Sequence, residues 1–354
     1  MYTFAHPIED ALENITHSIC TLEFEDQRPF YDWLMTQLAT GGLINTPPPK
    51  QYEFARLNLT YVVTSKRKLA QLVNDHHVAG WDDPRMPTIV GLRRRGYTPA
   101  AMRLFIERIG VTKSDAWIDY STLEGCLRET LDSEAARAMA VLDPVKLHIE
   151  NWDALMGAGH LEPCSAPVHP HDPERGTRAF SFGADLFIER DDYAEEPPKG
   201  YFRLFPGNKV RLKYGYIVEC IGAVRDADDR ITQVNARLIP DTKSGTPGAS
   251  SVKVKGVITW VGASDGVRAP VRLYDRLFKE SQPDGGGRDF IAALNTDSLQ
   301  TVAALLEPSL AQAAPGQSFQ FERLGYFVAD REEHQKGQPV FNRSVGLKDS
   351  WVAV

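Results

Sequence analysis

Residues 51–69 read Gln-Tyr-Glu-Phe-Ala-Arg-Leu-Asn-Leu-Thr-Tyr-Val-Val-Thr-Ser-Lys-Arg-Lys-Leu, and the rest of the chain is best understood from this stretch. An alternating segment leads into a β-branched run, then into two small hydroxyl side chains and three cations. This order predicts a strand, a loop and the start of a basic helix. A loop that offers the Thr64 and Ser65 hydroxyls, backbone N–H groups and Lys66 suits a polyphosphate, because lysine places a mobile positive charge beside anionic oxygens. The alternative is a solvated basic turn on the surface.

Length and composition predict a protein of about two to three domains. The chain has 354 residues, of which 42% are hydrophobic, so it can bury more than one core. It has no apolar run long enough to span a bilayer and no signal-peptide pattern at Met1, so we expect a cytoplasmic protein without membrane contact. Four widely spaced cysteines without a Cys-x-x-Cys pair indicate reduced thiols rather than a disulfide framework.

The charge is distributed unevenly along the chain. A net charge of −7 by itself argues against a nucleic-acid partner, but binding depends on where the charges lie. One basic block stands inside the acidic protein, and its cations are Arg56, Lys66, Arg67, Lys68, Arg85, Arg93, Arg94, Arg95, Arg103, Arg108 and Lys113. The acids within the same block are Asp75, Asp82, Asp83 and Glu107.

Residues 1–134 carry helix and strand patterns that change near the basic loop. Up to residue 60 the patterns read helix, strand, a second helix with Asp26 as N-cap, and strand, which is half of an α/β unit. From residue 61 to 134 they are helical, with Thr98 as an N-cap before Pro99. Ser121 and Glu124 have the spacing of a capping box. These patterns predict half of a sheet domain followed by a small helical domain.

The pattern becomes β-rich after Asp143-Pro144. Short apolar segments are separated by Pro and Gly, and residues 209–220 alternate as one strand with Arg211 and Lys213 on its polar face. The Gly/Ser/Pro-rich stretch 244–251 reads as a mobile loop. Strands interrupted by turns in this way are typical of antiparallel barrels or sandwiches.

The stretch Val63-Thr64-Ser65-Lys66-Arg67 resembles a degenerate form of the class I aminoacyl-tRNA synthetase signature Lys-Met-Ser-Lys-Ser, and its flanks resemble glutaminyl-tRNA synthetases. Val63 replaces the first Lys of the signature and Arg67 its final Ser, whereas the central Ser-Lys is kept. The resemblance covers essentially the whole chain. Further stretches that fit the family in order are Tyr2-Thr-Phe-Ala-His6, Ile15-Thr-His-Ser-Ile-Cys-Thr-Leu-Glu-Phe24, Gly80-Trp-Asp-Asp-Pro-Arg-Met-Pro-Thr88, Gly91-Leu-Arg-Arg-Arg-Gly-Tyr97 and Asp143-Pro-Val-Lys146.

The resemblance implies a multidomain α+β fold. Residues 1–60 would be the C-terminal half of the catalytic nucleotide-binding fold, a partial Rossmann-type half-unit, and 61–134 the helical domain with the signature loop. A proximal anticodon-binding β-barrel would comprise 135–160 and 251–354, and a distal anticodon-binding β-barrel would comprise 161–250. The family's His-Ile-Gly-His motif does not occur in the sequence. We therefore expect the C-terminal two-thirds of such an enzyme, inactive alone and weak in tRNA binding.

The activity that the resemblance implies is ATP-dependent ligation of L-glutamine to tRNA(Gln) through a glutaminyl-adenylate. ATP with Mg2+ would be a substrate, no tightly bound cofactor is expected, and the protein would be a monomer. Catalysis would rest on positioning and on stabilising phosphate charge, without a nucleophilic side chain. Two alternatives remain, which are a non-catalytic module that binds tRNA anticodons and a glutamyl-tRNA synthetase of the eukaryotic type.

The resemblance also assigns residues to the ligand sites. Lys66 and Ser65 match the catalytic positions. The positions that match ATP contacts are Thr21, Arg56, Leu57, Thr64, Ser65 and Lys66. Those that match the glutamine pocket are Tyr2, His6, Cys20 and Gln51. Glutamyl-type relatives have Arg in place of Cys20, and a neutral thiol is compatible with an amide rather than a carboxylate.

Positions that match anticodon contacts lie in the β-rich part and are Arg137, Arg203, Arg211, Lys213, Gln320 and Arg323. Lys213 is Arg in better-known members, and Gly200 stands where Gln is expected. Strict alternation would put Gln320 and Arg323 on opposite faces of one strand, which requires a core contact or a bulge. The alternative for each cation is a solvated surface side chain.

Cys164, His169 and His171 lie close together in the sequence and could suggest a metal site. Prolines stand between them, and no fourth ligand has the spacing of a zinc site, so we expect no bound metal.

Overall fold

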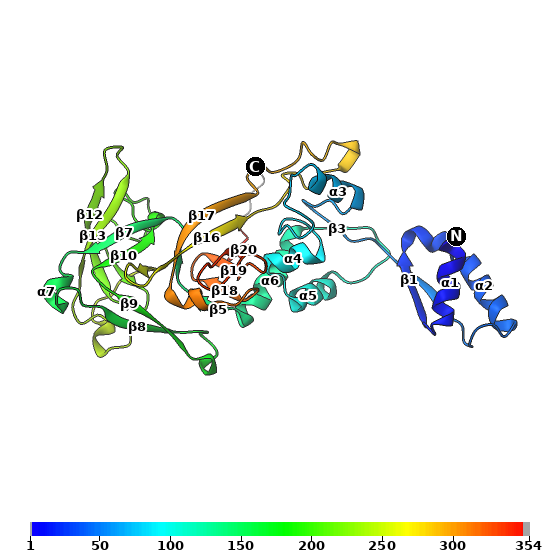
Figure 1. Ribbon diagram of the computed structural model, residues 1–354, viewed down its shortest axis with the longest axis horizontal. Helices are drawn as coiled ribbons and strands as arrows, with labels where there is room; N and C mark the ends of the chain where they lie inside the picture. Colours follow the sequence, from blue (N-terminus) through cyan, green and yellow to red (C-terminus); the bar gives the residue numbers. More distant parts are fainter. Residues whose placement is uncertain (1, 350–354) are drawn as a thin grey trace.

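The structure is a computed structural model that describes residues 2–349, and its first part is a small unit at one end of an elongated molecule (Figure 1). Two parallel strands, joined by a helix, pair from His17 opposite Lys50 to Thr21 opposite Phe54. The two helices pack around Tyr31 and Met35, so one face of the sheet is covered. The elements are α1 (Tyr2–Leu12), β1 (His17–Thr21), η1 (Leu22–Gln27), α2 (Arg28–Thr40) and β2 (Lys50–Phe54).

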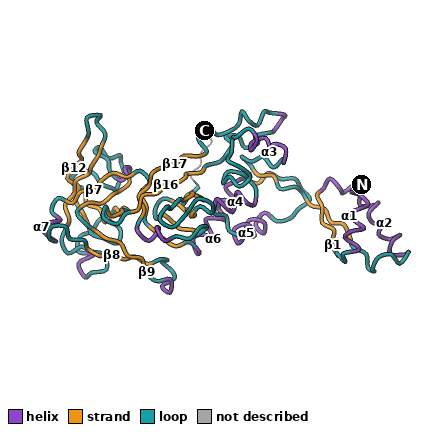
Figure 2. Tube along the Cα trace, viewed as in Figure 1, coloured by secondary structure: helices purple, strands orange, loops and turns teal. Residues whose placement is uncertain are grey.

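A helical region follows, and two extended segments connect it to the first unit (Figure 2). In these segments β3 pairs in parallel with β4, and the Ala55 N–H donates to the carbonyl of Thr112. The helices bury Leu123, Leu127 and Phe105, which is why the apolar stripes of this region face one another. The elements are β3 (Asn58–Leu59), α3 (Lys66–Asn74), α4 (Ile89–Arg95), α5 (Pro99–Ile109), β4 (Trp117–Ile118) and α6 (Tyr120–Glu134).

The remaining strands form two curled seven-stranded sheets and a separate hairpin. The first sheet has the order β14-β11-β12-β13-β7-β10-β15, and the second has the order β5-β18-β19-β20-β16-β17-β6. The strands and the helix of the first sheet and its hairpin are β7 (Pro144–Ile149), α7 (Trp152–Met156), β8 (Glu162–Pro167), β9 (Thr177–Phe182), β10 (Asp185–Glu189), β11 (Lys209–Leu212), β12 (Ile217–Arg225), β13 (Ile231–Leu238), β14 (Gly256–Ile258) and β15 (Val261–Gly262). Those of the second sheet are β5 (Ala136–Ala138), β6 (Ala140–Val141), β16 (Val267–Tyr274), β17 (Leu299–Leu306), β18 (Ser318–Phe321), β19 (Gly325–Ala329) and β20 (Phe341–Gly346).

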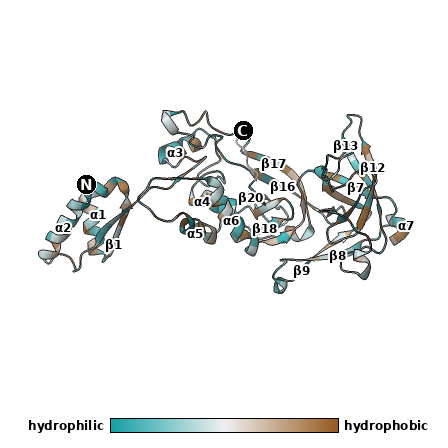
Figure 3. Cartoon of the chain, turned by 180° about the vertical axis from the view of Figure 1, so that it is seen from behind, coloured by the Kyte–Doolittle hydropathy of each residue, from teal (hydrophilic) through white to brown (hydrophobic). Residues whose placement is uncertain are grey.

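Each sheet encloses its own apolar core. The hairpin β8–β9 packs on the first sheet, where Phe182 and Trp260 meet edge to face at 4.9 Å between ring centroids. In the second sheet Phe321 and Phe327 stack at 4.2 Å. Figure 3 shows hydrophobic residues concentrated on strands such as β17, whereas α3 is mostly hydrophilic. The β-rich part of the chain therefore contains two packing units.

The helical region packs tightly on the second sheet at Gly96. This glycine caps α4 with a positive φ of 100°, and a Cβ there would lie 2.4 Å from the Ser344 Oγ on β20. Both the backbone conformation and the space therefore favour glycine.

Within residues 2–349 no helix combines the length and the apolar character that a membrane span requires.

Several expected details of the elements are wrong. Asp26 lies inside η1 and is not the N-cap of α2, and α6 is capped by Asp119, whose side chain accepts from the Ser121 N–H. Residues 209–220 do not form one strand, because the chain turns at Tyr214, which has a φ of 63°. The Thr98 cap before Pro99 is confirmed.

The two sheets also divide the chain differently from the expected barrel boundaries. Residues 144–149 and 256–262 pair within the first sheet, beside strands of residues 185–238. The expected proximal barrel, residues 135–160 and 251–354, includes both segments. Their pairing includes parallel contacts between distant parts of the chain, and hydrophobic alternation carries no information about the partner strand.

Candidate functional site

The predicted phosphate loop lies at the N-terminus of α3 with its polar groups exposed. Ser65 is the N-cap in an extended conformation, yet its hydroxyl makes no capping hydrogen bond. Thr64, Ser65 and Lys66 are all exposed, and within residues 2–349 none of their side chains has a hydrogen-bond or ion-pair partner. Two hydroxyls, an ammonium and the free N–H groups of a helix N-terminus thus share one site. Such a site favours an anion.

The residues around the loop explain its departures from the signature. Val63 is 1% exposed and packs with Leu72 and Phe290, so a lysine there would have to bury its charge. Lys68 pairs with Asp284 at 2.5 Å. Lys66 and Arg67 are therefore the cations left unpaired at the start of this helix, within the described part of the chain.

The four residues expected to bind glutamine gather in the N-terminal unit. The Tyr2 ring lies 5.2 Å from the His6 ring and 5.3 Å from that of Phe24. Gln51 is buried, and its Nε2 donates to the Phe24 carbonyl at 3.0 Å. The Cys20 thiol is buried on β1, the neighbouring strand, and donates to the Tyr52 carbonyl at 3.8 Å. Aromatic, amide and thiol groups from α1, β1 and β2 therefore share one neighbourhood.

A buried carboxylate on β2 lies under this neighbourhood. The side chain of Glu53 is fully buried and pairs with Arg28 and, at 3.1 Å, with Lys113 from the connecting segment after α5. Burial raises the pKa of the Cys20 thiol, although Arg28 and Lys113 oppose the rise. Cys20 is consequently a neutral, weakly polar group at neutral pH.

The residues expected to contact ATP are divided between two regions. Thr21 and Arg56 both bond to Glu23, and the hydroxyl of Thr21 is the main cause of the lowered pKa of that carboxyl. Leu57 lines a cavity of about 240 Å³ together with residues of α5. Figure 1 shows α3 in the helical region, apart from β1, so the structure does not bring Lys66 together with Thr21.

Of the six predicted anticodon residues, three lie where the two sheets meet, namely Arg203, Lys213 and Arg323, and each of the six is bonded within the chain. Arg323 donates two hydrogen bonds to the fully buried Asp192, at 2.6 and 2.7 Å, and Arg203 pairs with the same carboxylate at 3.3 Å. Lys213 pairs with Glu322, and Arg211 donates to the Thr242 carbonyl at 2.8 Å. We call this set of charged side chains the sheet seam, and its members are Arg178, Asp192, Arg203, Lys213, Glu307, Glu322 and Arg323, of which the three acids and Arg178 are buried.

The centre of the sheet seam is Arg178 on β9. Its guanidinium lies 2.8 Å from Glu307 and 2.5 Å from Glu322, and all three side chains are at most 5% exposed. The Tyr214 hydroxyl donates to Glu322 at 3.1 Å. Two buried carboxylates and a buried guanidinium, with a partly exposed ammonium and phenol, therefore join the hairpin of the first sheet to the second sheet.

Arg137 and Gln320 form a second cluster beside the seam. They are register partners in the β5–β18 pair. Arg137 donates to Asp132 Oδ1 at 2.9 Å, the same atom accepts from the Tyr326 hydroxyl at 3.1 Å, and Gln320 donates to that hydroxyl at 2.9 Å. These two predicted residues are thus brought together through one acid and one phenol.

The expected conflict between Gln320 and Arg323 does not arise. β18 ends at Phe321, and Arg323 lies in the following turn with a φ of 72°. The prediction of a core contact or a bulge was wrong because the strand is shorter than the alternation suggested. Sequence reasoning also missed the acids that pair with these cations, since Glu322 and Asp192 lie 109 and 131 positions from Lys213 and Arg323.

The residues considered for a metal site serve other roles. Cys164 is buried in the core of the first sheet, where burial raises its pKa to about 11. The His169 ring bonds to the Asp132 carbonyl and the His171 N–H. Among residues 2–349 no group of three or more His, Cys, Asp or Glu side chains is arranged to hold a metal, and all four cysteines are unpaired.

Comparison with known proteins matches three family models along the chain. Residues 1–133 match "tRNA synthetases class I (E and Q), catalytic domain", and residues 135–239 and 257–330 match two models of the anti-codon binding domain of the same class. Similar curated proteins include a glutamine–tRNA ligase of Cupriavidus necator, 62% identical over 351 residues, and one of Ralstonia nicotianae, 63% identical over 351 residues. These alignments cover 99% of this chain, and 59% and 60% of the two relatives. A third, of Bordetella pertussis, is 62% identical over 353 residues. The chain therefore spans about three-fifths of the length of these relatives.

Proposed function

Because the chain belongs to the class I tRNA synthetases of the glutamate and glutamine type, we propose that it serves in an ATP-dependent glutamine–tRNA ligase. The reaction would join L-glutamine to tRNA(Gln) through a glutaminyl-adenylate. This chain would contribute the signature loop, part of the amino-acid pocket and the anticodon-binding surface. The proposal covers the whole protein's activity, of which the chain accounts for about three-fifths of the relatives' length.

The observation that carries the proposal is the free loop at the start of α3. Lys66 and Ser65 would stabilise the negative charge that grows on the phosphates of ATP as pyrophosphate leaves, and Thr64 would add a hydroxyl. The bound nucleotide would bring Mg2+, whose charge would lie beside the same oxygens. Thr21, Arg56 and Leu57 would contact the rest of ATP, which requires the N-terminal unit and the helical region to approach each other.

The finer architecture is also part of this proposal. The parallel β1-α2-β2 arrangement supports the second half of a Rossmann-type nucleotide fold, because two parallel strands joined by a helix are its repeating element. The two curled sheets support anticodon-binding barrels. We propose a monomer in the cytoplasm.

The amino-acid pocket would be formed by Tyr2, His6, Cys20 and Gln51. Cys20 is neutral, and it would accept the amide of glutamine without offering a cation to glutamate. Tyr2 and His6 would orient the substrate from α1. Tyr2 and Gln51 both contact Phe24, which supports a shared role for the side chains from α1 and β2.

Anticodon recognition would use the cations and the amide near the sheet seam. Guanidinium and amide groups can hydrogen-bond unstacked bases. Arg203, Lys213 and Arg323 would then exchange a carboxylate partner for a base, and Arg137 would likewise have to release Asp132. Gln320 would present the oxygen of its amide. The buried acids hold these side chains in place before RNA arrives.

The test is Lys66→Ala in a protein of the relatives' full length that contains this chain. If Lys66 meets charge that develops in the transition state, single-turnover adenylate formation falls about 100-fold or more, while ATP binding changes little. Arg67→Ala is the matched control, because it removes the same charge from the next residue of α3. Equal rates for Lys66→Ala and Arg67→Ala would remove Lys66 from the mechanism.

A further inference from the structure

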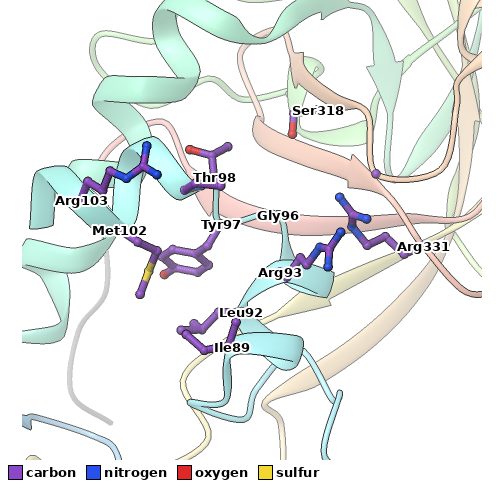
Figure 4. Close-up of a pocket in the computed structure, with 12 residues that line it drawn as sticks. Ile89, Leu92, Arg93, Gly96, Tyr97, Thr98, Met102, Arg103, Ser318 and Arg331 are labelled. Atoms are coloured by element: carbon purple, nitrogen blue, oxygen red, sulfur yellow. The ribbon is translucent and has the colours of Figure 1, made fainter. Parts of the chain in front are cut away.

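A cavity of about 580 Å³ opens between the helical region and the second sheet (Figure 4). Ile89 and Leu92 of α4 and Met102 of α5 line it with apolar atoms. Gly316, Ser318 and Arg331 line it from the second sheet and its loops, so the cavity forms only where the two regions meet. Its size is within the range of small-molecule sites.

Three arginines that have no side-chain partner among residues 2–349 line this cavity. Arg93, Arg103 and Arg331 come from α4, from α5 and from the loop after β19. Within residues 2–349 none of their guanidinium groups has an ion-pair or hydrogen-bond partner, and none of the described residues that line the cavity is acidic. In a chain with a net charge of −7, this is a local excess of positive charge.

The arginines that follow Arg93 in the sequence are used differently. Arg94 pairs with Asp82 at 2.8 Å and with Asp330 at 3.1 Å. Arg95 is 3% exposed and donates to the Ser344 carbonyl at 3.2 Å. Two of the three consecutive guanidinium groups therefore hold the helical region to the second sheet, and Arg93 is left facing the cavity.

The position of Arg331 is set by a glycine. Gly316 has a φ of 80°, and a Cβ at this position would lie 3.0 Å from the Arg331 Cζ. The guanidinium thus rests against the glycine backbone. Figure 4 shows Arg93 and Arg331 next to each other, with Arg103 on another side of the cavity.

We propose that this cavity binds a nucleotide unit, with its phosphate at Arg93 and Arg331 and its base against the apolar side chains. Guanidinium groups bind phosphate oxygens in pairs, and unpaired ones lose no internal contact when they do so. A base has an apolar face that suits Ile89, Leu92 and Met102. The N-terminus of α5, at Thr98 and Pro99, also lines the cavity and favours the same charge.

The nucleotide unit has two possible sources, a free nucleotide or one nucleotide of a bound RNA. The site is separate from the loop at Thr64–Lys66 and from the sheet seam, since it shares no residue with either. The inference therefore does not rest on the proposed ligase function. A loss of nucleotide binding at the cavity can therefore be distinguished from a loss at the loop Thr64–Lys66.

The experiment titrates AMP, and separately inorganic phosphate, into the 354-residue chain and measures the heat of binding. Arg93→Gln and Arg331→Gln should each weaken AMP binding about tenfold or more, because each removes a charged hydrogen-bond donor. Ile89→Asp should weaken it as well by placing a negative charge at the cavity. Ile89 is 72% exposed and begins α4, where an acidic residue is favourable, so this variant should fold.

Arg268→Gln is the matched control, because Arg268 is exposed, lies on β16 and has no partner within the described residues. Its AMP affinity should equal that of the unchanged chain. Inorganic phosphate should bind more weakly than AMP. Equal affinity for phosphate and AMP would overturn the role of the apolar side chains and with it the nucleotide proposal.

A second set of titrations uses tRNA at a fixed salt concentration and identifies the source of the nucleotide unit. AMP binding that depends on Arg93 and Arg331 supports a free nucleotide. The alternative outcome is that AMP does not bind, whereas tRNA binding is weakened more by the cavity variants than by Arg268→Gln. That outcome supports a nucleotide of the RNA. The cavity variants are Arg93→Gln, Arg331→Gln and Ile89→Asp. If neither ligand distinguishes these variants from Arg268→Gln, the proposal is wrong. If AMP binding is lost in Lys66→Ala and unchanged in Arg93→Gln, the nucleotide site is the loop, and the cavity proposal fails while the ligase proposal stands.

Discussion

The loop at Thr64–Lys66 and the sheet seam are both rich in polar and cationic groups, but they hold these groups in opposite ways. At the loop the hydroxyls and the ammonium are exposed and without partners among residues 2–349. At the seam Arg178, Lys213 and Arg323 are paired with Glu322, Glu307 or Asp192. Free groups can bind a small anion without first breaking a contact. Paired groups add to stability and must exchange partners before they can bind a base.

The largest effect that this comparison predicts is on stability. Arg178→Met leaves Glu307 and Glu322 buried with less compensating charge, so the free energy of unfolding should fall by about 3 to 5 kcal/mol. Burial already raises the pKa of Glu307, against the opposing effect of Arg178. The loss should therefore be smaller at low pH, where the carboxyl takes up a proton. Urea unfolding of the chain at pH 7 and pH 5 measures both effects.

The control for this prediction is Lys66→Met, which removes an exposed cation without a described partner. Its effect on the free energy of unfolding should be within about 0.5 kcal/mol, as for most surface substitutions. A loss of under 1 kcal/mol for Arg178→Met would show that the seam is not the stabilising network that its burial indicates. The contrast between the two regions would then have no energetic basis.

The next effect is on tRNA binding, and it shows whether Arg211 recognises an anticodon base or only positions a loop of the protein. Arg211 donates to the carbonyls of Thr242 and Ala249, so it holds the segment that includes η4 (Pro247–Ser250) near the first sheet. If it also contacts the anticodon, Arg211→Ala should weaken binding of glutamine tRNA by about 1 to 3 kcal/mol and affect a tRNA with an altered anticodon less. Binding titrations with both tRNAs at one salt concentration test this.

Equal losses for the two tRNAs would assign Arg211 to the RNA backbone or to the loop it holds. Arg230→Ala is a suitable control, because Arg230 is an exposed cation beyond β12 of the same sheet. It should change the binding of both tRNAs by similar, small amounts.

The loop was predictable from the sequence because its groups are neighbours in the chain. Thr64, Ser65 and Lys66 are consecutive, and the strand-to-helix pattern around them correctly indicated that α3 begins at Lys66. The buried Val63 could not be predicted in this way, since its partners include Phe290, far along the chain.

The seam was predictable only in part. The resemblance pointed to its cations, but the acids that hold them had no local signal. Arg178 meets Glu322 across 144 positions, and this pair exists only because two sheets pack together. The cavity lined by Arg93, Arg103 and Arg331 was hidden for the same reason. Sequence patterns describe neighbours along an element, whereas partner choice between sheets depends on tertiary packing.

The smallest predicted effect is a pH dependence at a partly buried ion pair far from the loop. The Glu162 carboxylate accepts from Lys243, and this hydrogen bond is the main cause of the lowered pKa of Glu162. A carboxyl with a lowered folded-state pKa contributes stability above its unfolded pKa, near 4.5, and loses that contribution as the pH falls through the folded value. Lys243→Met should therefore destabilise the chain by about 0.2 to 1 kcal/mol at pH 7 and by less near pH 3. Urea unfolding across this range measures the difference, with Lys66→Met as the control that should show no such trend. A loss independent of pH would mean that the Lys243 side chain acts through its apolar stem, and that paired and free cations differ less here than at the sheet seam.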